Sequence, residues 1–235
     1  MVGETARVRG GLYDIGVGVP DAADGIAHWQ RFGYREGKRG GLDATAAEAL
    51  YGVKSELNSV RLFHQDSDRG LIRLMVWDRP TGPGLNMAPL RTMGTRWSVH
   101  KTDDMITCLN HAEMQEVLGG PIYKLGPHMN PHIPDADHPE PRPFSEPIAC
   151  VRDLIMFLPY YQHVAMTRYN FDMPLYGRVN PDCLFKTSEV CHAAIVTKGD
   201  DMSVYDFYED VFGLKRWGQR EIDHETSWMA TTMHA

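Results

Sequence analysis

Residues 191–213 read CHAAIVTKGDDMSVYDFYEDVFG and show most clearly how this chain is built. The apolar stretch that begins at His192 predicts a strand, and the KGDD that follows predicts a loop that caps a helix. The helix is predicted over 202–212, and Gly213 ends it because glycine adopts the left-handed conformation at little cost. The segment therefore predicts a strand, a loop and a helix in succession.

The same order of elements occurs twice more in the chain. Near the N-terminus, YDIGVGVPDAADGIAHWQRFGY (13–34) alternates apolar residues, breaks at Pro20 and ends a helix at Gly33. In the middle, RWSVHKTDDMITCLNHAEMQEVLGG (96–120) again gives a strand, an Asp-Asp loop, a helix and a glycine. Strand-like segments follow each of the first two helices, so each unit is predicted to be βαβββ.

These units predict an α+β fold of tandem βαβββ modules whose curved mixed sheets surround a cleft. A four-stranded sheet cannot cover its own concave face, so such units pair. We expect a pair of modules in 1–180, at about 10–90 and 95–175, and the start of a third module in 185–235. The third is incomplete, and we expect further sequence or another polypeptide to complete it, because an unpaired edge strand favours aggregation.

Composition limits the partners that this chain can have. A net charge of -7 and the lack of a Lys/Arg stripe argue against a nucleic-acid partner. No apolar run reaches membrane-spanning length, so we expect a cytoplasmic protein that acts on a small molecule, as a homo-oligomer or completed by further sequence. The four cysteines form no CxxC pair and are expected to be mostly buried thiols. They are Cys108, Cys150, Cys183 and Cys191.

His192 followed by FYEDVFGL (207–214) resembles the first half of a module of the vicinal oxygen chelate superfamily. This superfamily includes glyoxalase I, bleomycin-resistance proteins, extradiol dioxygenases and 4-hydroxyphenylpyruvate dioxygenase. The resemblance is closest in 191–214 and extends to 12–36 and 95–120. The motif is short and mainly structural, so it specifies the fold better than the activity.

The resemblance implies where metal ligands would lie. In this superfamily a ligand commonly opens the first strand of a module, and another lies on its last strand. The matching positions hold Asp14 and Arg73 in the first module and Trp97 in the second. Arginine and tryptophan have no lone pair for a metal, so we expect the first two modules to be metal-free. In the third module His192 holds this position and is expected to be a metal ligand.

Two metal-free modules followed by one that begins with histidine resemble the dioxygenase branch. This implies a metal-dependent enzyme, an Fe(II) dioxygenase acting on an aromatic or 2-oxo acid substrate, with further ligands outside the chain. Zinc, nickel or manganese instead of iron would indicate a glyoxalase-type lyase or isomerase. The alternative is a metal-free, drug-sequestering protein, in which Asp14, Arg73 and Trp97 leave an aromatic-lined cleft.

Other polar residues are candidates for contact with the substrate. His224, beside Glu225 in a predicted hairpin of the third module, is the candidate for catalytic acid/base chemistry. His163 and Arg168 are candidates for holding a carboxylate or phenolate, although neighbouring aromatic residues also suit a core strand. Trp97 is the third candidate for substrate binding.

The segment GPHMNPHIPDADHPEPRPFSEP (126–147) combines histidines with carboxylates. Its prolines exclude a helix that would align His128 with His132 as metal ligands. We expect a polyproline-like loop between two strands of the second module, which would function as a lid or as an arm to a neighbouring subunit.

Overall fold

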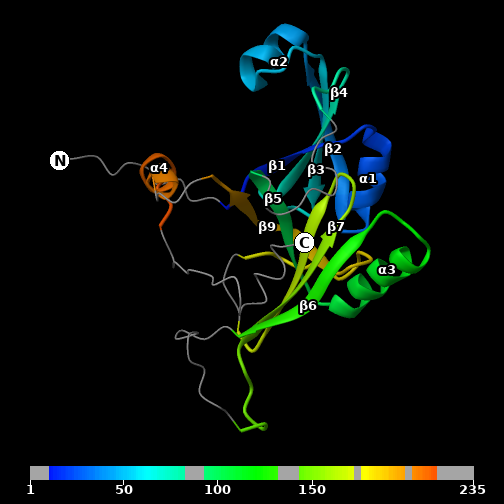
Figure 1. Ribbon diagram of the computed structural model, residues 1–235, viewed down its shortest axis with the longest axis vertical. Helices are drawn as coiled ribbons and strands as arrows, with labels where there is room; N and C mark the ends of the chain where they lie inside the picture. The colour runs from blue at the N-terminus through cyan, green and yellow to red at the C-terminus, as the bar shows by residue number, and fades with distance from the viewer. Residues whose placement is uncertain (1–10, 83–92, 132–142, 172–175, 199–202, 216–235) are drawn as a thin grey trace, which may run out of the picture.

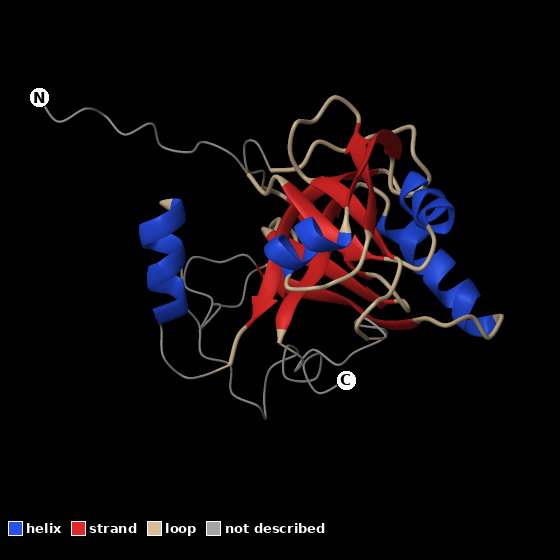
Figure 2. Ribbon diagram, turned by 90° about the horizontal axis from the view of Figure 1, so that it is seen from above, coloured by secondary structure: helices blue, strands red, loops and turns tan. Residues whose placement is uncertain are grey.

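The computed structural model describes residues 11–82, 93–131, 143–171, 176–198 and 203–215 (Figure 1). Its strands lie in the middle of the molecule, and its helices lie on the outside (Figure 2). This arrangement of mixed sheets and a few helices confirms the predicted α+β class. None of the helices within these ranges combines the length and the apolar character that a membrane span requires.

The first sheet has the strand order β1-β4-β3-β2 and contains the first predicted module. Its strands are β1 (Asp14–Gly18), β2 (Tyr34–Leu42), β3 (Leu57–His64) and β4 (Leu71–Trp77). β1 runs parallel to β4, and the other neighbours are antiparallel. α1 (Ala22–Gln30) begins after Asp21, whose side chain accepts hydrogen bonds from the first turn. The helical segment ends at Gly33, as predicted, with a φ of +86°.

A second helix interrupts the first module between β2 and β3. α2 (Ala44–Tyr51) is capped by the Asp43 carboxylate and ends at Gly52, which has a φ of +70°. This helix was not predicted from the sequence, although DATAAEALYG contains an N-cap residue, four helix-favouring alanines and a glycine stop. It adds a short helix to the periphery of the sheet and leaves the strand order of the module unchanged (Figure 1).

The second sheet has the order β6-β7-β8-β5-β9 and contains the second predicted module. Its strands are β5 (Gly94–Thr102), β6 (Tyr123–Pro131), β7 (Cys150–Phe157), β8 (Gln162–Tyr169) and β9 (Thr187–Val196). β5 runs parallel to β8, as β1 does to β4 in the first sheet. α3 (Met105–Val117) packs on β6, β7 and β8. The two modules therefore repeat the same order of strands, which confirms the tandem βαβββ prediction.

β9 is the strand that was predicted to open a third module. It begins at Thr187, five residues before His192, and pairs antiparallel with β5 at the edge of the second sheet. α4 (Ser203–Phe212) follows it, close to the predicted 202–212, and lies on the outside of the molecule (Figure 1), where its residues and those of β9 line a common pocket. Residues 216–235 lie outside the described part of the chain, so the third module stays a prediction.

One core joins the two modules. Trp29 of α1 is 1% exposed and contacts the rings of Tyr34 in its own module and of His100 and His163 in the second. Apolar side chains of both sheets, such as Leu74 of β4 and Leu154 of β7, belong to the same buried cluster. Since the two sheets share these contacts, the pair of modules is expected to unfold as one unit.

Tyr34 ties β9 to the first module. Its buried hydroxyl donates a hydrogen bond to the Gly70 carbonyl (2.8 Å) and accepts one from the Val190 N–H (2.8 Å). Gly70 lies in the β3–β4 turn with a φ of +62°, and an added Cβ there would come within 2.4 Å of the Val190 oxygen. The turn and β9 therefore approach each other backbone to backbone, which only glycine allows.

We predict that Tyr34→Phe lowers the free energy of unfolding by about 1 to 3 kcal/mol, because it leaves a buried N–H and a buried carbonyl without the hydroxyl. Urea denaturation at neutral pH measures this change. Tyr123→Phe is the matched control, since Tyr123 is 42% exposed, and its stability should stay close to that of the wild type. Equal stabilities of the two variants would contradict the bridging role of Tyr34.

Candidate functional site

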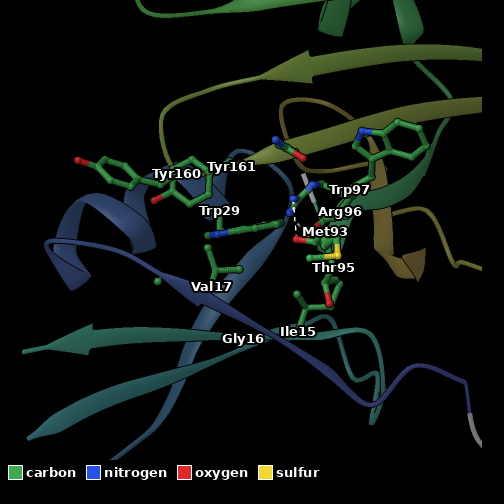
Figure 3. A pocket seen from close by; sticks show the side chains of 14 residues that line it. Ile15, Gly16, Val17, Trp29, Met93, Thr95, Arg96, Trp97, Tyr160 and Tyr161 are labelled. Carbon is green, nitrogen blue, oxygen red and sulfur yellow. Dashed lines mark hydrogen bonds between the residues drawn. The ribbon is translucent and has the colours of Figure 1, made fainter. Parts of the chain in front are cut away.

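A cavity of about 380 Å³ lies between the first strands of the two modules (Figure 3). Its walls are residues 15–18 of β1, residues 93–98 at the start of β5, the 160–162 segment that begins β8, and Trp29. Four of the lining side chains are tryptophan or tyrosine, and they come from both modules. The cavity can therefore bind a planar, mostly apolar molecule in contact with both modules at once.

A β-bulge shapes one wall of this cavity. Arg96 pairs with Ala194 and Ser98 with Ala193, so Trp97 is an extra residue on β5, and its φ is +48°. Bulges redirect side chains and are common beside functional sites, and a left-handed tryptophan is unusual. The structure thus places Trp97, predicted from the sequence to bind substrate, in the cavity wall (Figure 3). Its contact with a substrate stays a prediction.

Arg96 brings a positive charge into the same wall. The residue is 2% exposed, and its guanidinium donates hydrogen bonds to the carbonyls of Thr95 (2.9 Å) and Met93 (2.8 Å). Burial lowers its pKa from the ordinary arginine value. Arg96 was not identified from the sequence, because a single arginine before Trp97 has no local pattern that separates it from a surface residue.

Three histidines lie together next to Trp29 and Tyr161, two of the aromatic residues that line the cavity. They are His28 of α1, His100 of β5 and His163 of β8. The Nε2 atoms of His28 and His163 are 2.8 Å apart, within hydrogen-bond distance, and His100 Nδ1 donates to the Ser188 carbonyl (3.0 Å). The ring of His163 is fully buried and contacts Trp29 and Tyr161, which line the cavity. His163 itself does not line it, so its predicted role in binding substrate is untested.

Arg168 and His192, two further candidates, meet at Tyr176. The guanidinium carbon of Arg168 lies 3.7 Å from the centre of the Tyr176 ring, and the Tyr176 hydroxyl is hydrogen-bonded to His192 Nδ1. His192 faces Val99 across the β5–β9 pair, next to the extra residue Cys191. This cluster is separate from the cavity, which neither Arg168 nor His192 lines. Tyr176 was not identified from the sequence.

In the first module the two positions that correspond to metal ligands hold an ion pair. Arg73 Nη2 lies 2.5 Å from Asp14 Oδ2, and Arg73 Nε lies 3.0 Å from the same oxygen. Arg61 is a second cation within 3.5 Å of this carboxylate. Two guanidinium groups thus lie beside the Asp14 carboxylate. Asp14 therefore pairs with arginine and is unsuitable as a ligand for a metal ion.

Within the residues that the structure describes, no three His, Cys, Asp or Glu side chains are grouped so that they could hold a metal ion. His192 is therefore a single candidate ligand there. Its ring is oriented through Nδ1 by Tyr176, as histidine ligands commonly are by a neighbouring group. His224 and Glu225 lie outside the described residues, as do residues 132–142 of the proline-rich segment, which include His132. Residues 126–131 of that segment belong to β6 instead of the expected loop.

No protein-family model matches the sequence, and no curated protein matches it at a significant level. Among solved structures, the chain is similar to the crystal structure of a glyoxalase family protein from Bacillus cereus, with a TM-score of 0.48. The two chains share 10% sequence identity, and the similar part covers 71% of this chain and 97% of that chain. The tandem βαβββ architecture rests on the strand order and register of the chain itself.

The buried histidines predict that acid destabilises the protein. Burial is the main cause that lowers the pKa of His28 and His100 to about 3, and it lowers the pKa of His163 as well. At His28 and His100 the unfolded chain therefore takes up protons near pH 6.5, whereas the folded chain does so only near pH 3. We expect the free energy of unfolding to fall below pH 6.5, by up to about 1.4 kcal/mol per pH unit for each histidine.

Urea denaturation between pH 7.5 and about 5 tests this, above the usual carboxyl range. Burial also lowers the pKa of His64, and that of His192 to about 4, so both add to the effect. Asp153, whose pKa is raised to about 6 by burial, acts in the opposite direction but is one group against five. His28→Gln should reduce the slope, because it removes one of these histidines. His111→Gln, at an exposed position of α3, should leave the slope unchanged. A stability that is constant over this range would contradict the prediction.

Proposed function

We propose that this chain is a small-molecule-binding protein of the vicinal oxygen chelate type, with its ligand in the cavity between the two modules. The observation that carries the proposal is the position of this cavity, where the first strands of both modules meet around aromatic side chains. Its volume of about 380 Å³ lies within the range of small-molecule sites, about 300 to 1,000 Å³.

The residues at the positions of metal ligands support a binding role for the first two modules. Asp14 and Arg73 neutralise each other in the first module, and Trp97 contributes an aromatic surface in the second. A ligand in this cavity would be held by stacking on aromatic rings and by hydrogen bonds to a few polar groups, among them Arg96 and Gln162.

Dansylamide, a small planar fluorophore, tests the proposal. We expect it to bind the wild-type protein with a blue-shifted emission and one site per chain. Thr95→Trp should weaken binding by about tenfold or more, because the exposed Thr95 lies in the cavity wall and a tryptophan there fills the space.

Ile106→Trp is the control for this substitution. Ile106 is 63% exposed on α3 and is not part of the cavity wall, so its replacement should leave the affinity for dansylamide within about twofold. Equal losses in the two variants, or binding at many weak sites, would overturn the proposal.

A second candidate function is the metal-dependent enzyme, an Fe(II) dioxygenase acting on an aromatic or 2-oxo acid, with a glyoxalase-type lyase or isomerase as its variant. The observation that favours it is the orientation of the His192 ring by Tyr176. The described residues do not provide the other ligands, so this function requires ligands from outside them. Two imidazoles and one carboxylate is the set that Fe(II) oxygenases use.

Metal analysis of anaerobically purified protein distinguishes the two functions. The enzyme predicts about one iron per chain, or zinc, nickel or manganese for the lyase branch, and loss of the metal in His192→Ala. His111→Ala, which removes an exposed histidine of α3, should retain it. Metal-free wild-type protein after supply of Fe(II) would exclude the metal-dependent function for this chain.

A further inference from the structure

A second cavity of about 540 Å³ adjoins the first. Its walls include Val19, Val53, Trp77 and Pro80, so they come from β1, from the loop after α2 and from the end of β4. The side chains that line it are all uncharged, whereas the first cavity contains Arg96 and the polar Thr95, Ser98 and Gln162. The two cavities therefore differ in charge, since a charged side chain, Arg96, lines only the first.

Gly18 and Tyr160 belong to the walls of both cavities. Gly18 is the last residue of β1, and Tyr160 precedes β8 with 43% of its surface exposed. The first cavity follows β1 from Ile15 to Gly18, and the second continues to Pro20. At about 3.3 Å per residue, the two together extend for about 16 Å along the chain.

We propose that the two cavities form one groove for an elongated ligand, with a planar polar end in the first cavity and an uncharged apolar end in the second. This inference rests on the proposed binding function and specifies the class of ligand. Gly18 is the position that determines the length of the ligand, because it lies where the two parts meet.

The lack of a side chain at Gly18 is what keeps this junction open. An added Cβ at Gly18 would meet no atom within 4 Å, and the backbone there is not in the left-handed region. A larger residue is therefore tolerated by the fold and extends into the groove. At Gly16, two residues earlier in β1, a Cβ would instead come within 2.9 Å of the Met75 sulfur, so the space beside that position is already filled.

Dansylamide and N-octyl dansylamide test the inference, because they share a fluorophore and differ only in an apolar chain of about 10 Å. We expect the octyl compound to bind the wild-type protein at least about tenfold more tightly. Gly18→Phe should abolish this gain, so that the two compounds bind this variant with affinities within about twofold of each other. Gly40→Phe is the matched control, since a Cβ at Gly40 meets only the Ser59 hydroxyl, at 3.9 Å, and lies outside both cavities.

Val53→Trp provides an independent test, because it fills the second cavity without touching the junction. It should also remove the gain from the octyl chain and retain dansylamide binding. The elongated groove is wrong if dansylamide binds the wild type but N-octyl dansylamide binds it no more tightly. It is also wrong if the tighter binding of the octyl compound survives in Gly18→Phe and Val53→Trp. In both cases the binding function stands. If neither compound binds the wild type, the binding function itself fails.

Discussion

The burial of Trp29 between the two modules is the interaction on which the rest of the structure depends. Trp29 comes from α1 of the first module, yet rings of β5 and β8 in the second cover it. Burying a tryptophan is worth several kcal/mol at about 25 cal/mol per Å² of apolar surface. Neither four-stranded unit could enclose this side chain alone, because each leaves one face of its sheet open.

The same contact creates the candidate site. Trp29 lines the cavity and its ring also contacts His100 and His163, so the cavity borders the shared core. Buried rings support this wall on the side away from the cavity, among them Phe32, which contacts Trp29 and stacks on His163. A binding site whose walls are held in this way needs little rearrangement when a ligand enters.

Much of the fold could be predicted from the sequence, but less of the site. The alternation of apolar residues, the Asp caps and the glycine stops gave the strands and helices of both modules, while α2 was missed. Trp97 was identified because it holds a position that the resemblance marks as functional. Arg96 and Tyr176 were missed. Arg96 bonds to backbone carbonyls one and three residues away, which no side-chain pattern marks, and Tyr176 meets His192 sixteen residues further along the chain. His163 was singled out for its polar neighbours along the chain, and its contact with His28 depends on how the modules pack.

The sequence by itself determined the repeated order of strands and helices, because hydrophobic period, caps and breakers act over a few residues. Only the tertiary structure decided that Trp29 lies between the modules, that the two cavities meet at Gly18, and that His192 faces Tyr176. These contacts join residues that are from 16 to more than 100 positions apart, and their geometry is set by sheet register and by the bulges at Trp97 and Cys191. A shift of one residue in either register would turn these side chains to the other face of the sheet.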